Sequence, residues 1–481
     1  MGKATNRNVF HLRTLLISAV SLLALSGSAN AQSPDTNALV QQGKAVATAA
    51  DCMACHTVPR GGKPFAGGYG IVSPLGTIYS TNITPSKEFG IGTYSEEDFA
   101  NAVRKGIRKD GGHLYPAMPY DAYGEITDAD IHALYAYFMN GVEPVDEPAK
   151  AQTQLPFPFN IRISMMAWNL AFANREPFAP DPAKSDEQNR GAYLAGALGH
   201  CASCHAPRNI LMGQAANAEL TGGMVGSWYA PNITSDPISG IGGWTETELM
   251  QYFRTGHVEG KAQAAGGMAE AVQNSLQHLP DSDLKSLAVY LKSTSPVRDP
   301  QDKAARHAFT GKGSDEAAIR GLFPENSHNS LKTGAELYSG YCASCHQPEA
   351  AGSEGQAYPS LFNNTTIGSR NPANLISTIL YGVERETGGH EILMPGFGPQ
   401  SYVNALSDTQ IAEIANYVLN RFGNSDVKVS VEDVETARNG GPTPLLAKLQ
   451  PFILPGLAGG LVFLSALLGW YFLYRRKQGE M

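Results

Sequence analysis

The chain has 481 residues, of which 42% are hydrophobic and 17% charged, and its formal net charge is −8. With 51 glycines and 30 prolines, this is the composition of a globular protein rich in turns, which excludes a disordered, a collagen-like or a polytopic membrane protein. The acidic charge argues against a nucleic-acid binder. The length allows about three domains.

Residues 1–31 have the pattern of a secretory signal peptide. A basic start is followed by an apolar stretch over 15–25 that is too short to span a bilayer, and Ala29-Asn30-Ala31 fits a cleavage site. The alternative is an uncleaved anchor helix, which the short apolar stretch disfavours. We therefore expect the mature body, beginning at Gln32, to be exported to a compartment that permits oxidised cysteine chemistry.

Three copies of the pattern C-x-x-C-H, at residues 52–56, 201–205 and 342–346, contain all six cysteines. This is the attachment signature of c-type haem, because two thiols one helical turn apart can each form a thioether to a haem vinyl group and the next histidine can bind the iron. A redox-active C-x-x-C pair, a zinc site and a disulfide framework are the alternatives. None of them explains a histidine beside every pair, and no spare thiol exists to complete a zinc site.

The sequence thus predicts three covalent haems. Their thioether positions are Cys52, Cys55, Cys201, Cys204, Cys342 and Cys345, and their histidine ligands are His56, His205 and His346.

Each motif is expected between two helices. A glycine-led segment at 43–45, 191–193 and 334–336 begins the helix before each motif. The closing helices carry four apolar residues on one face, at Ile131, Leu134, Tyr137 and Phe138, at Leu284, Leu287, Tyr290 and Leu291, and at Ile411, Ile414, Tyr417 and Val418. Acidic capping clusters precede them at 127–128, 281–283 and 407–408. Two terminal helices that cross beside a haem are typical of cytochrome c.

The first two repeats are more similar to each other than to the third. Asn82-Ile83-Thr84 recurs as Asn232-Ile233-Thr234, and Gly90-Ile91-Gly92 recurs as Gly240-Ile241-Gly242, both after 150 residues. This offset indicates duplication of one ancestral unit. We interpret these pieces as turns, since no strand–GxGxxG–helix context surrounds the glycines.

A methionine opposite the histidine would complete each iron site and raise its potential. Three methionines precede the closing helices, Met118, Met268 and Met394, and the first two keep the offset of 150 residues. Core packing is the alternative role for any one methionine. Four histidines in the same loops are rival ligands, although none recurs in all three units: His113, His257, His278 and His390. A six-coordinate set disfavours peroxidase or oxygen chemistry.

The C-terminal region contains one predicted membrane span. No charged residue occurs over 452–474, a stretch that would extend about 34 Å as a helix, enough for the hydrocarbon core. Trp470, Tyr471 and Tyr474 suit the membrane interface, and the basic residues 475–477 place the C-terminus in the cytoplasm. A buried core helix is the less favoured alternative.

The predicted fold is mainly α, with three tandem cytochrome c domains and one C-terminal transmembrane helix. In chain order we expect a signal peptide (1–31), the first domain (32–145), a linker (146–185), the second domain (186–295), a linker (296–330), the third domain (331–425), a membrane-proximal segment (426–451), the transmembrane helix (452–474) and a cytoplasmic tail (475–481). An apolar segment at 161–170 is interpreted as inter-domain packing in preference to a docking surface for a partner or membrane.

No motif for binding or transforming an organic substrate occurs, so we expect no catalytic residue on this chain toward such a substrate. A two-electron donor would then be on another polypeptide.

The mature chain resembles the triheme cytochrome c subunits of membrane-bound dehydrogenases of acetic acid bacteria and related proteobacteria. The similarity is carried by the stretches 73–85, 106–108 and 115–120 together with the three haem motifs. It implies a subunit that joins a large periplasmic dehydrogenase, anchors it to the cytoplasmic membrane and passes its electrons to ubiquinone.

The C-terminal span, with 155–159 and 391–395, is similar to the branch that serves flavin-dependent fructose, gluconate or sorbitol dehydrogenases. This branch implies FAD on the large partner and a small third subunit. The alternatives are the cytochrome subunit of a quinoprotein or molybdopterin alcohol or aldehyde dehydrogenase, and a relay to a terminal oxidase. A haem enzyme or gas sensor with an open iron is a separate class, which the methionines disfavour.

Overall fold

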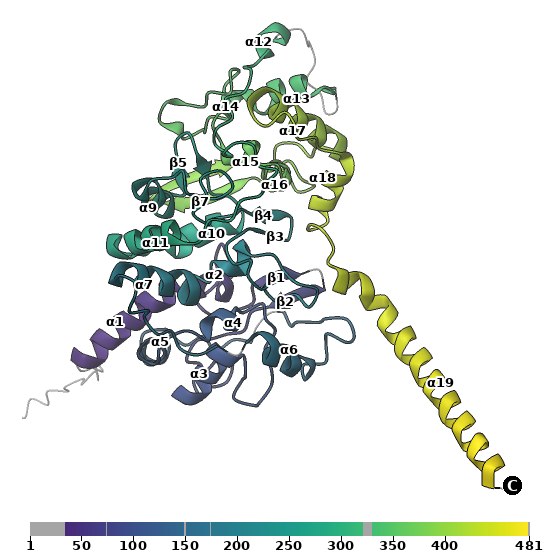
Figure 1. Ribbon diagram of the computed structural model, residues 1–481. Helices are drawn as coiled ribbons and strands as arrows, with labels where there is room; N and C mark the ends of the chain where they lie inside the picture. Colours follow the sequence, from purple (N-terminus) through teal and green to yellow (C-terminus); the bar gives the residue numbers. More distant parts are fainter. Residues whose placement is uncertain (1–33, 74, 149–150, 174, 321–329, 480–481) are drawn as a thin grey trace, which may run out of the picture.

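Figure 1 shows the computed structural model, which describes residues 34–73, 75–148, 151–173, 175–320 and 330–479. Its regular structure is mostly helical, as predicted. Small two-stranded antiparallel sheets, which the sequence did not predict, also occur in the described part. The predicted signal peptide at 1–31 lies outside the described residues.

Three stretches of chain repeat one arrangement of elements, and we call them the first unit (34–145), the second unit (186–295) and the third unit (330–438). The first contains α1 (Pro34–Ala49), α2 (Cys52–His56), β1 (Gly70–Ser73), β2 (Gly76–Tyr79), α3 (Glu96–Lys105), α4 (Tyr120–Tyr123) and α5 (Asp128–Asn140).

The second unit contains α7 (Asp186–Tyr193), its π-helical continuation η1 (Leu194–Leu198), α8 (Ala202–His205), β3 (Gly223–Val225), β4 (Trp228–Ala230), α9 (Glu246–Thr255), β5 (His257–Val258), β6 (Ala262–Gln263), α10 (Gly267–Asn274), the 3₁₀ turn η2 (Leu276–His278) and α11 (Asp281–Ser293).

The third unit contains α13 (Gly334–Tyr341), α14 (Ala343–His346), the 3₁₀ turn η3 (Glu354–Gln356), α15 (Thr365–Gly368), α16 (Ala373–Tyr381), β7 (Val383–Thr387), β8 (His390–Met394), α17 (Asp408–Phe422) and α18 (Val431–Arg438). Outside the units lie α6 (Ser164–Phe172), α12 (Glu316–Ile319) and α19 (Leu445–Gly479).

In every unit the first helix crosses the closing helix at a glycine. Helix α1 packs against α5, α7 against α11 and α13 against α17. A Cβ added to Gly43, Gly191 or Gly334 would lie 1.9, 2.0 or 2.4 Å from a carbonyl oxygen of the facing helix. The glycine that marks the repeat in the sequence is therefore the point of closest backbone approach.

The closing helices bury the predicted apolar face, except that Tyr290 and Tyr417 are half-buried beside the glycines of the facing helices. Thr127 and Ser407 cap α5 and α17 through their side chains. Helix α11 differs from the prediction, because Pro280 occupies its capping position and makes no side-chain cap. Asp281 lies inside the first turn instead, where its negative charge favours the helix N-terminus.

The three helix pairs share two hydrophobic cores in the described residues. One core runs through both the first and the second unit, from Val40 to Leu291. The other belongs to the third unit and continues beyond residue 425, because Val434 and Ala437 of α18 are buried in it. Units one and two are thus packed as one body.

The third unit reaches back over the other two through its β7–β8 hairpin, in which Val383 pairs with Met394 and Thr387 with His390. Strand β7 lies against α10, and Arg60 of the first unit forms an ion pair with Glu384. In Figure 1 the units succeed one another from α3 and α5 at one end to α13 at the other.

The segment around α6 divides its apolar side chains between packing and solvent. Trp168 donates its indole N–H to the carbonyl of Leu211, 3.0 Å away, and Phe172 lies against Gly213. Ile163 and Leu170 are 68% and 77% exposed. The predicted inter-domain packing therefore covers only part of this segment.

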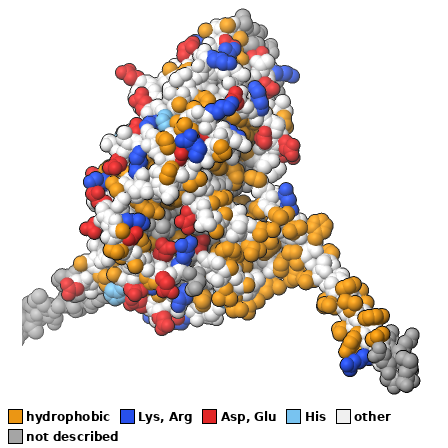
Figure 2. Space-filling view, viewed as in Figure 1, with side chains coloured by type: hydrophobic (Ala, Val, Ile, Leu, Met, Phe, Trp, Pro, Cys, Tyr) orange, Lys and Arg blue, Asp and Glu red, His pale blue; other side chains and the backbone are white. Residues whose placement is uncertain are grey.

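Helix α19 projects away from the body (Figure 1). It is long and apolar enough to cross a membrane over Leu445–Arg476, and none of its apolar stretch is buried. It begins seven residues before the predicted span and includes Pro451 and Pro455. Gln450 ties its start to the body by donating to the carbonyl of Phe157 at 2.8 Å. Hydrophobic side chains gather on the body next to this start (Figure 2).

We predict that Gly191→Ala destabilises the fold by about 1–3 kcal/mol, because overpacking at a helix crossing forces the two backbones apart. The added Cβ would lie 2.0 Å from the carbonyl oxygen of Ser286. Thermal unfolding of the purified protein measures this effect. Gly196→Ala is the matched control, since its Cβ would have Glu125 Oε2 at 3.6 Å, an ordinary contact. Equal melting temperatures for both variants would contradict the prediction.

Candidate haem-binding sites

The three C-x-x-C-H motifs occupy the same position in each unit, on a short helix directly after the first long helix. These short helices are α2, α8 and α14, and each ends at the histidine of its motif. The six thiols are partly buried and form no disulfide. One helical turn separates the two thiols of a motif, which is the spacing needed for attachment to the two vinyl groups of one haem.

The environment of the thiols is that of inert cysteines. Burial raises the pKa of Cys52, Cys201 and Cys342 to about 12. A redox-active C-x-x-C pair requires a thiol whose pKa lies below its ordinary value. The structure therefore disfavours a thiol–disulfide oxidoreductase and agrees with cysteines that serve as attachment points.

A backbone carbonyl orients each motif histidine. The Nδ1 atoms of His56, His205 and His346 lie 2.7, 2.6 and 2.9 Å from the carbonyl oxygens of Thr81, Pro231 and Pro359. A carbonyl can only accept, so Nδ1 carries the proton and Nε2 is the nitrogen that can bind iron.

Burial lowers the pKa of all three imidazoles, which keeps them neutral as a metal ligand must be. Two thiols on one turn and an imidazole held in the tautomer with a free Nε2 fit a covalently attached haem in every motif.

The same loop supplies these carbonyls in the first two units, and an asparagine braces it. Asn82 follows Thr81, accepts from the backbone N–H and hydroxyl of Thr84 at 2.9 and 2.7 Å, and donates to the carbonyl of Val145 at 2.9 Å. Asn232 repeats all three bonds with Thr234 and Val297, at 2.8, 2.8 and 2.7 Å.

The Asn-Ile-Thr repeat, which at the level of sequence indicated only duplication, thus holds the histidine-orienting carbonyl to the segment after the closing helix. Its recurrence after 150 residues was the signal that could have identified it. The carbonyl acceptors themselves have no sequence signal, because every residue has a carbonyl.

The predicted methionine ligands occupy three different local structures. Met118 lies in a turn before α4 and packs on the first core. Met268 is the second residue of α10, and Met394 is the last residue of β8. Of the three, only Met118 therefore lies outside a regular helix or strand. All three side chains are half-buried, and their coordination of iron stays a prediction.

Among the rival histidines, His278 and His390 are exposed, which makes them poor ligands for a buried haem. His113 and His257 are half-buried.

The first and second motifs lie close together. Helix α10 of the second unit packs against α2, and α4 of the first packs against η1. Burial, followed by Asp51 and then by Glu270 and Cys204 of the second unit, raises the pKa of Cys55 to about 12. Tyr123 donates its hydroxyl to the carbonyl of Ala50 at 2.6 Å, and its ring lies 5.5 Å from that of His200.

A buried carboxyl lies at this junction. Asp51 has left-handed backbone dihedrals immediately before the first motif, and its Oδ1 is buried without a hydrogen-bond partner among the described residues. Burial, and to a smaller extent the nearby Glu270, raise its pKa to about 8. The sequence patterns did not single out Asp51.

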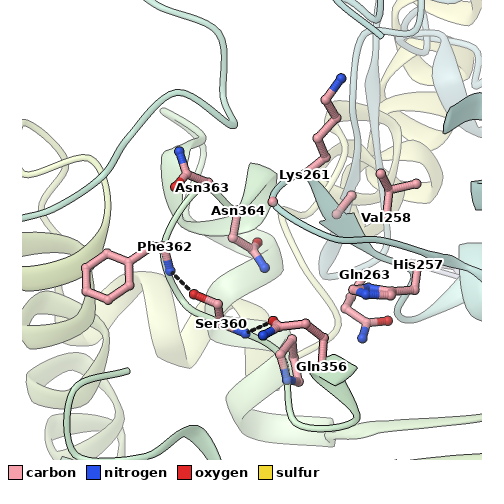
Figure 3. A pocket seen from close by; sticks show the side chains of 12 residues that line it. His257, Val258, Lys261, Gln263, Gln356, Ser360, Phe362, Asn363 and Asn364 are labelled. Atoms are coloured by element: carbon pink, nitrogen blue, oxygen red, sulfur yellow. Dashed lines mark hydrogen bonds between the residues drawn. The ribbon is translucent and has the colours of Figure 1, made fainter. Parts of the chain in front are cut away.

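The third motif meets the second unit at a small cleft (Figure 3). Ser360 lies there, opposite the β5–β6 hairpin. It follows Pro359, whose carbonyl accepts the hydrogen bond from His346. Ser360 accepts from the backbone N–H of Phe362 at 3.0 Å, and its own N–H donates to Gln356 Oε1 at 2.7 Å. These bonds brace the loop that orients His346 internally, and Thr365 N–H ties the following segment to the second unit by donating to the carbonyl of Lys261 at 2.8 Å.

Comparison with protein-family models finds two matches. The model "Cytochrome c" matches residues 40–141, and "Cytochrome C oxidase, cbb3-type, subunit III" matches residues 329–418.

Three relatives are similar over most of their length. The chain is 48% identical to the fructose dehydrogenase cytochrome subunit of Gluconobacter japonicus, over 91% of each chain. It is 38% identical to the gluconate 2-dehydrogenase cytochrome c subunit of Pantoea cypripedii, over 88% of this chain and 94% of the relative. It is also 38% identical to the cytochrome c subunit of the quinone alcohol dehydrogenase of Gluconobacter oxydans, over 89% and 87%.

We predict that Cys342→Ser combined with Cys345→Ser removes one covalent haem, because serine cannot form the thioether bonds. The haem content per chain, measured by the pyridine haemochrome absorbance, should fall by about one third if three motifs are loaded. Ser344→Ala, which leaves both thiols in place, is the matched control. Retention of the full haem content in the double variant would contradict the prediction.

Proposed function

Because the chain belongs to the family of cytochrome c subunits of bacterial dehydrogenases, we propose that it is an electron-transfer subunit with three covalent c-type haems in three tandem cytochrome c domains. The observation that carries this proposal is the threefold recurrence of a C-x-x-C-H helix whose histidine donates Nδ1–H to a backbone carbonyl. Bound haem c supplies one-electron transfer. The chain's own residues attach, orient and enclose it.

The packing of the units supports a relay. The first and second motifs lie against each other across one shared core, and the β7–β8 hairpin fastens the third unit to the other two. Residues rigidly packed in this way hold successive carriers at fixed separations, so each transfer has the same geometry in every turnover.

The proposed anchor is α19. Its apolar side chains are exposed. Exposing them to water costs free energy, whereas the hydrocarbon core of a bilayer removes that cost. The basic residues 475–477 place the C-terminus on the cytoplasmic side and the body on the periplasmic side of the membrane. The signal sequence predicted at 1–31 agrees with export of the body. We assign the chain to the inner membrane.

The proposed electron donor is a large periplasmic flavoprotein of the fructose or gluconate type, with a small third subunit, and the acceptor is ubiquinone. The 48% identity to the fructose dehydrogenase cytochrome subunit, against 38% for both the gluconate and the alcohol dehydrogenase relatives, supports the fructose type. The alternative is service to a quinoprotein or molybdopterin alcohol or aldehyde dehydrogenase. A relay to a terminal oxidase is the third candidate.

We predict that the tagged chain, captured from solubilised native membranes, brings with it a large subunit that contains FAD. Mass spectrometry identifies the subunit, and a fluorescence assay identifies the cofactor. Pyrroloquinoline quinone or molybdopterin on the partner would move the assignment to the alcohol or aldehyde branch. If quinol-oxidase subunits were the only partners, the proposal of a dehydrogenase donor would be wrong, and a relay to a terminal oxidase would replace it.

We predict that Met394→His lowers the reduction potential of one haem and abolishes its sulfur-to-iron absorption band, because a methionine ligand raises the potential relative to histidine. A spectroelectrochemical titration measures both effects. Met166→His is the control, since Met166 on α6 is 49% exposed and outside the three units. An unchanged potential and band in Met394→His would exclude this methionine as a ligand.

We predict that a chain ending at residue 444 is released from membranes as a soluble cytochrome with all its haems, because α19 carries the apolar stretch long enough to span. Fractionation followed by haem staining tests this outcome. Recovery of the shortened chain in the membrane fraction would show that other surfaces suffice for attachment.

A further inference from the structure

The segment that joins the second and third units is not a free linker. Residues 306–309 are held by the third unit: Asn363 donates its backbone N–H to the carbonyl of Phe309 at 2.9 Å and its side-chain amide to that of His307 at 3.1 Å. A Cβ on Gly368 would lie 1.7 Å from the carbonyl oxygen of Arg306. The third unit therefore fixes the backbone of this segment.

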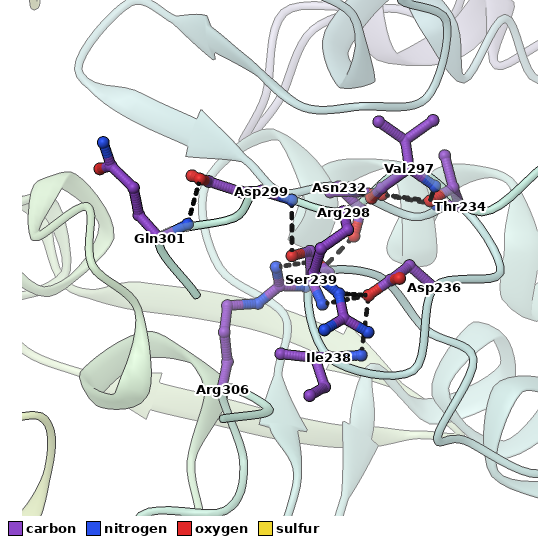
Figure 4. Close-up of polar contacts among 10 residues, drawn as sticks. All are labelled: Asn232, Thr234, Asp236, Ile238, Ser239, Val297, Arg298, Asp299, Gln301 and Arg306. Carbon is purple, nitrogen blue, oxygen red and sulfur yellow. Dashed lines mark hydrogen bonds and ion pairs between the residues drawn. The ribbon is translucent and has the colours of Figure 1, made fainter. Parts of the chain in front are cut away.

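From this fixed backbone the side chain of Arg306 reaches into the second unit (Figure 4). Nη1 donates to the carbonyl of Ser239, and Nη2 donates to the carbonyl of Asn232 at 3.2 Å. The Nε atom is buried and has no hydrogen-bond partner among the described residues.

No carboxylate pairs with this guanidinium in the part of the chain that the structure describes, and burial lowers its pKa. A buried guanidinium held only by neutral carbonyls is costly unless an anion is nearby.

A cavity of about 520 Å³ lies beside this guanidinium. It is lined mainly by polar side chains, among them those of Thr221, Tyr229, Asn232, Ser239, Arg306 and Arg370.

Two chain neighbours link this cavity to the second motif. Gly222, next to Thr221, donates its N–H to the carbonyl of His205 at 2.8 Å. Pro231, next to Asn232, accepts from His205 Nδ1 at 2.6 Å. Arg306 Nη2 donates to the carbonyl of Asn232, the residue directly after Pro231, so the guanidinium lies on the same loop that orients His205.

We propose that Arg306 binds a propionate carboxylate of the haem attached to the second motif through the part of its guanidinium that borders this cavity. This proposal rests on the proposed function, since it requires a haem there. Haem c has two propionates, which are anions that guanidinium groups bind well. Arg306 would be a positioning and potential-setting residue supplied to the second haem by the segment that leads to the third.

The first unit lacks this residue although it repeats the surrounding network. Thr84 Oγ1 accepts from the N–H of Val145, and Thr234 Oγ1 accepts from that of Val297, both at 3.1 Å. Nine residues after Val297 comes Arg306, whereas nine residues after Val145 comes the neutral Gln154. At the same chain spacing from this shared bond, the second unit is thus followed by a positive charge and the first by a neutral side chain.

The sign of the effect follows from the charges. Oxidised haem iron carries one more positive charge than reduced iron, so a nearby buried cation favours reduction and raises the potential. Two carboxylates of the chain lie near Arg306 and could compete with a propionate for its guanidinium. Asp299 is already engaged, because it accepts from Gln301 and Arg370. Asp302 is the remaining carboxylate beside it.

The decisive experiment is a potentiometric titration of the full-length holoprotein with Arg306→Gln. We expect the potential of one haem to fall, by about a tenfold change in its oxidation equilibrium, which is about 59 mV for a one-electron couple. The other two potentials should stay unchanged. Lys303→Gln is the matched control, because it removes the same charge from the same segment at a side chain that is 84% exposed. Asp302→Asn should not reproduce the fall.

Two further experiments distinguish a failure of this proposal from a failure of the proposed function. Mass spectrometry of peptides first establishes whether haem is attached at Cys201 and Cys204; its absence there would overturn the proposed function itself. With haem attached, unchanged potentials in Arg306→Gln, or an equal shift in Lys303→Gln, would overturn only the role of Arg306. In a chain lacking this haem, Cys201→Ser with Cys204→Ser, the substitution at Arg306 should have no effect on the remaining potentials.

If Arg306→Gln fails to fold, two results still decide the question. Arg306→Lys keeps the charge and should shift the potential less than tenfold. An experimental density map of the wild-type protein should place a haem carboxylate oxygen within hydrogen-bond distance of the Arg306 guanidinium. A map in which Asp302 or water alone occupies that position would overturn the proposal.

Discussion

The contact on which the structure depends is the crossing of two helices at a glycine, which occurs once in each unit. At Gly43, Gly191 and Gly334 the first helix lies so close to a carbonyl of the closing helix that a side chain would not fit. Because the C-x-x-C-H motif begins only eight to ten residues after this glycine, the crossing sets where the thiols and the imidazole lie relative to the core. The apolar face of the closing helix supplies the stabilising burial, and the glycine sets the distance.

A second set of contacts fixes the orientation and the tautomer of the motif histidines. A histidine that binds iron through Nε2 needs its proton on Nδ1, and in each unit a backbone carbonyl holds the motif histidine in this tautomer. In the first two units that carbonyl belongs to a loop held by Asn82 or Asn232, whose amide is tied to the segment after the closing helix. The segments between units therefore help to hold these loops, and the role proposed for Arg306 would extend the same principle from hydrogen bonding to charge.

The assembly of the units explains how a relay can be rigid without a single large core. The first and second units share one hydrophobic core, so their motifs cannot move apart without exposing it. The third unit has a core of its own. It is attached to the others by the β7–β8 hairpin, by the segment around Arg306 and by the contacts that border the cleft at Ser360. Polar contacts dominate this second junction.

The sequence by itself determined the features that depend on local chemistry. Thiol spacing, the adjacent histidines, the helical periodicity, the long uncharged C-terminal stretch and the family all follow from residues near each other in the chain. Only the tertiary structure decided which carbonyl meets each histidine, that two units share one core, that Met268 begins a helix and Met394 ends a strand, and that Arg306 enters the second unit. Each of these depends on contacts between residues far apart in sequence. Such contacts are set by how whole elements pack, and they leave no periodic or spaced pattern in the chain.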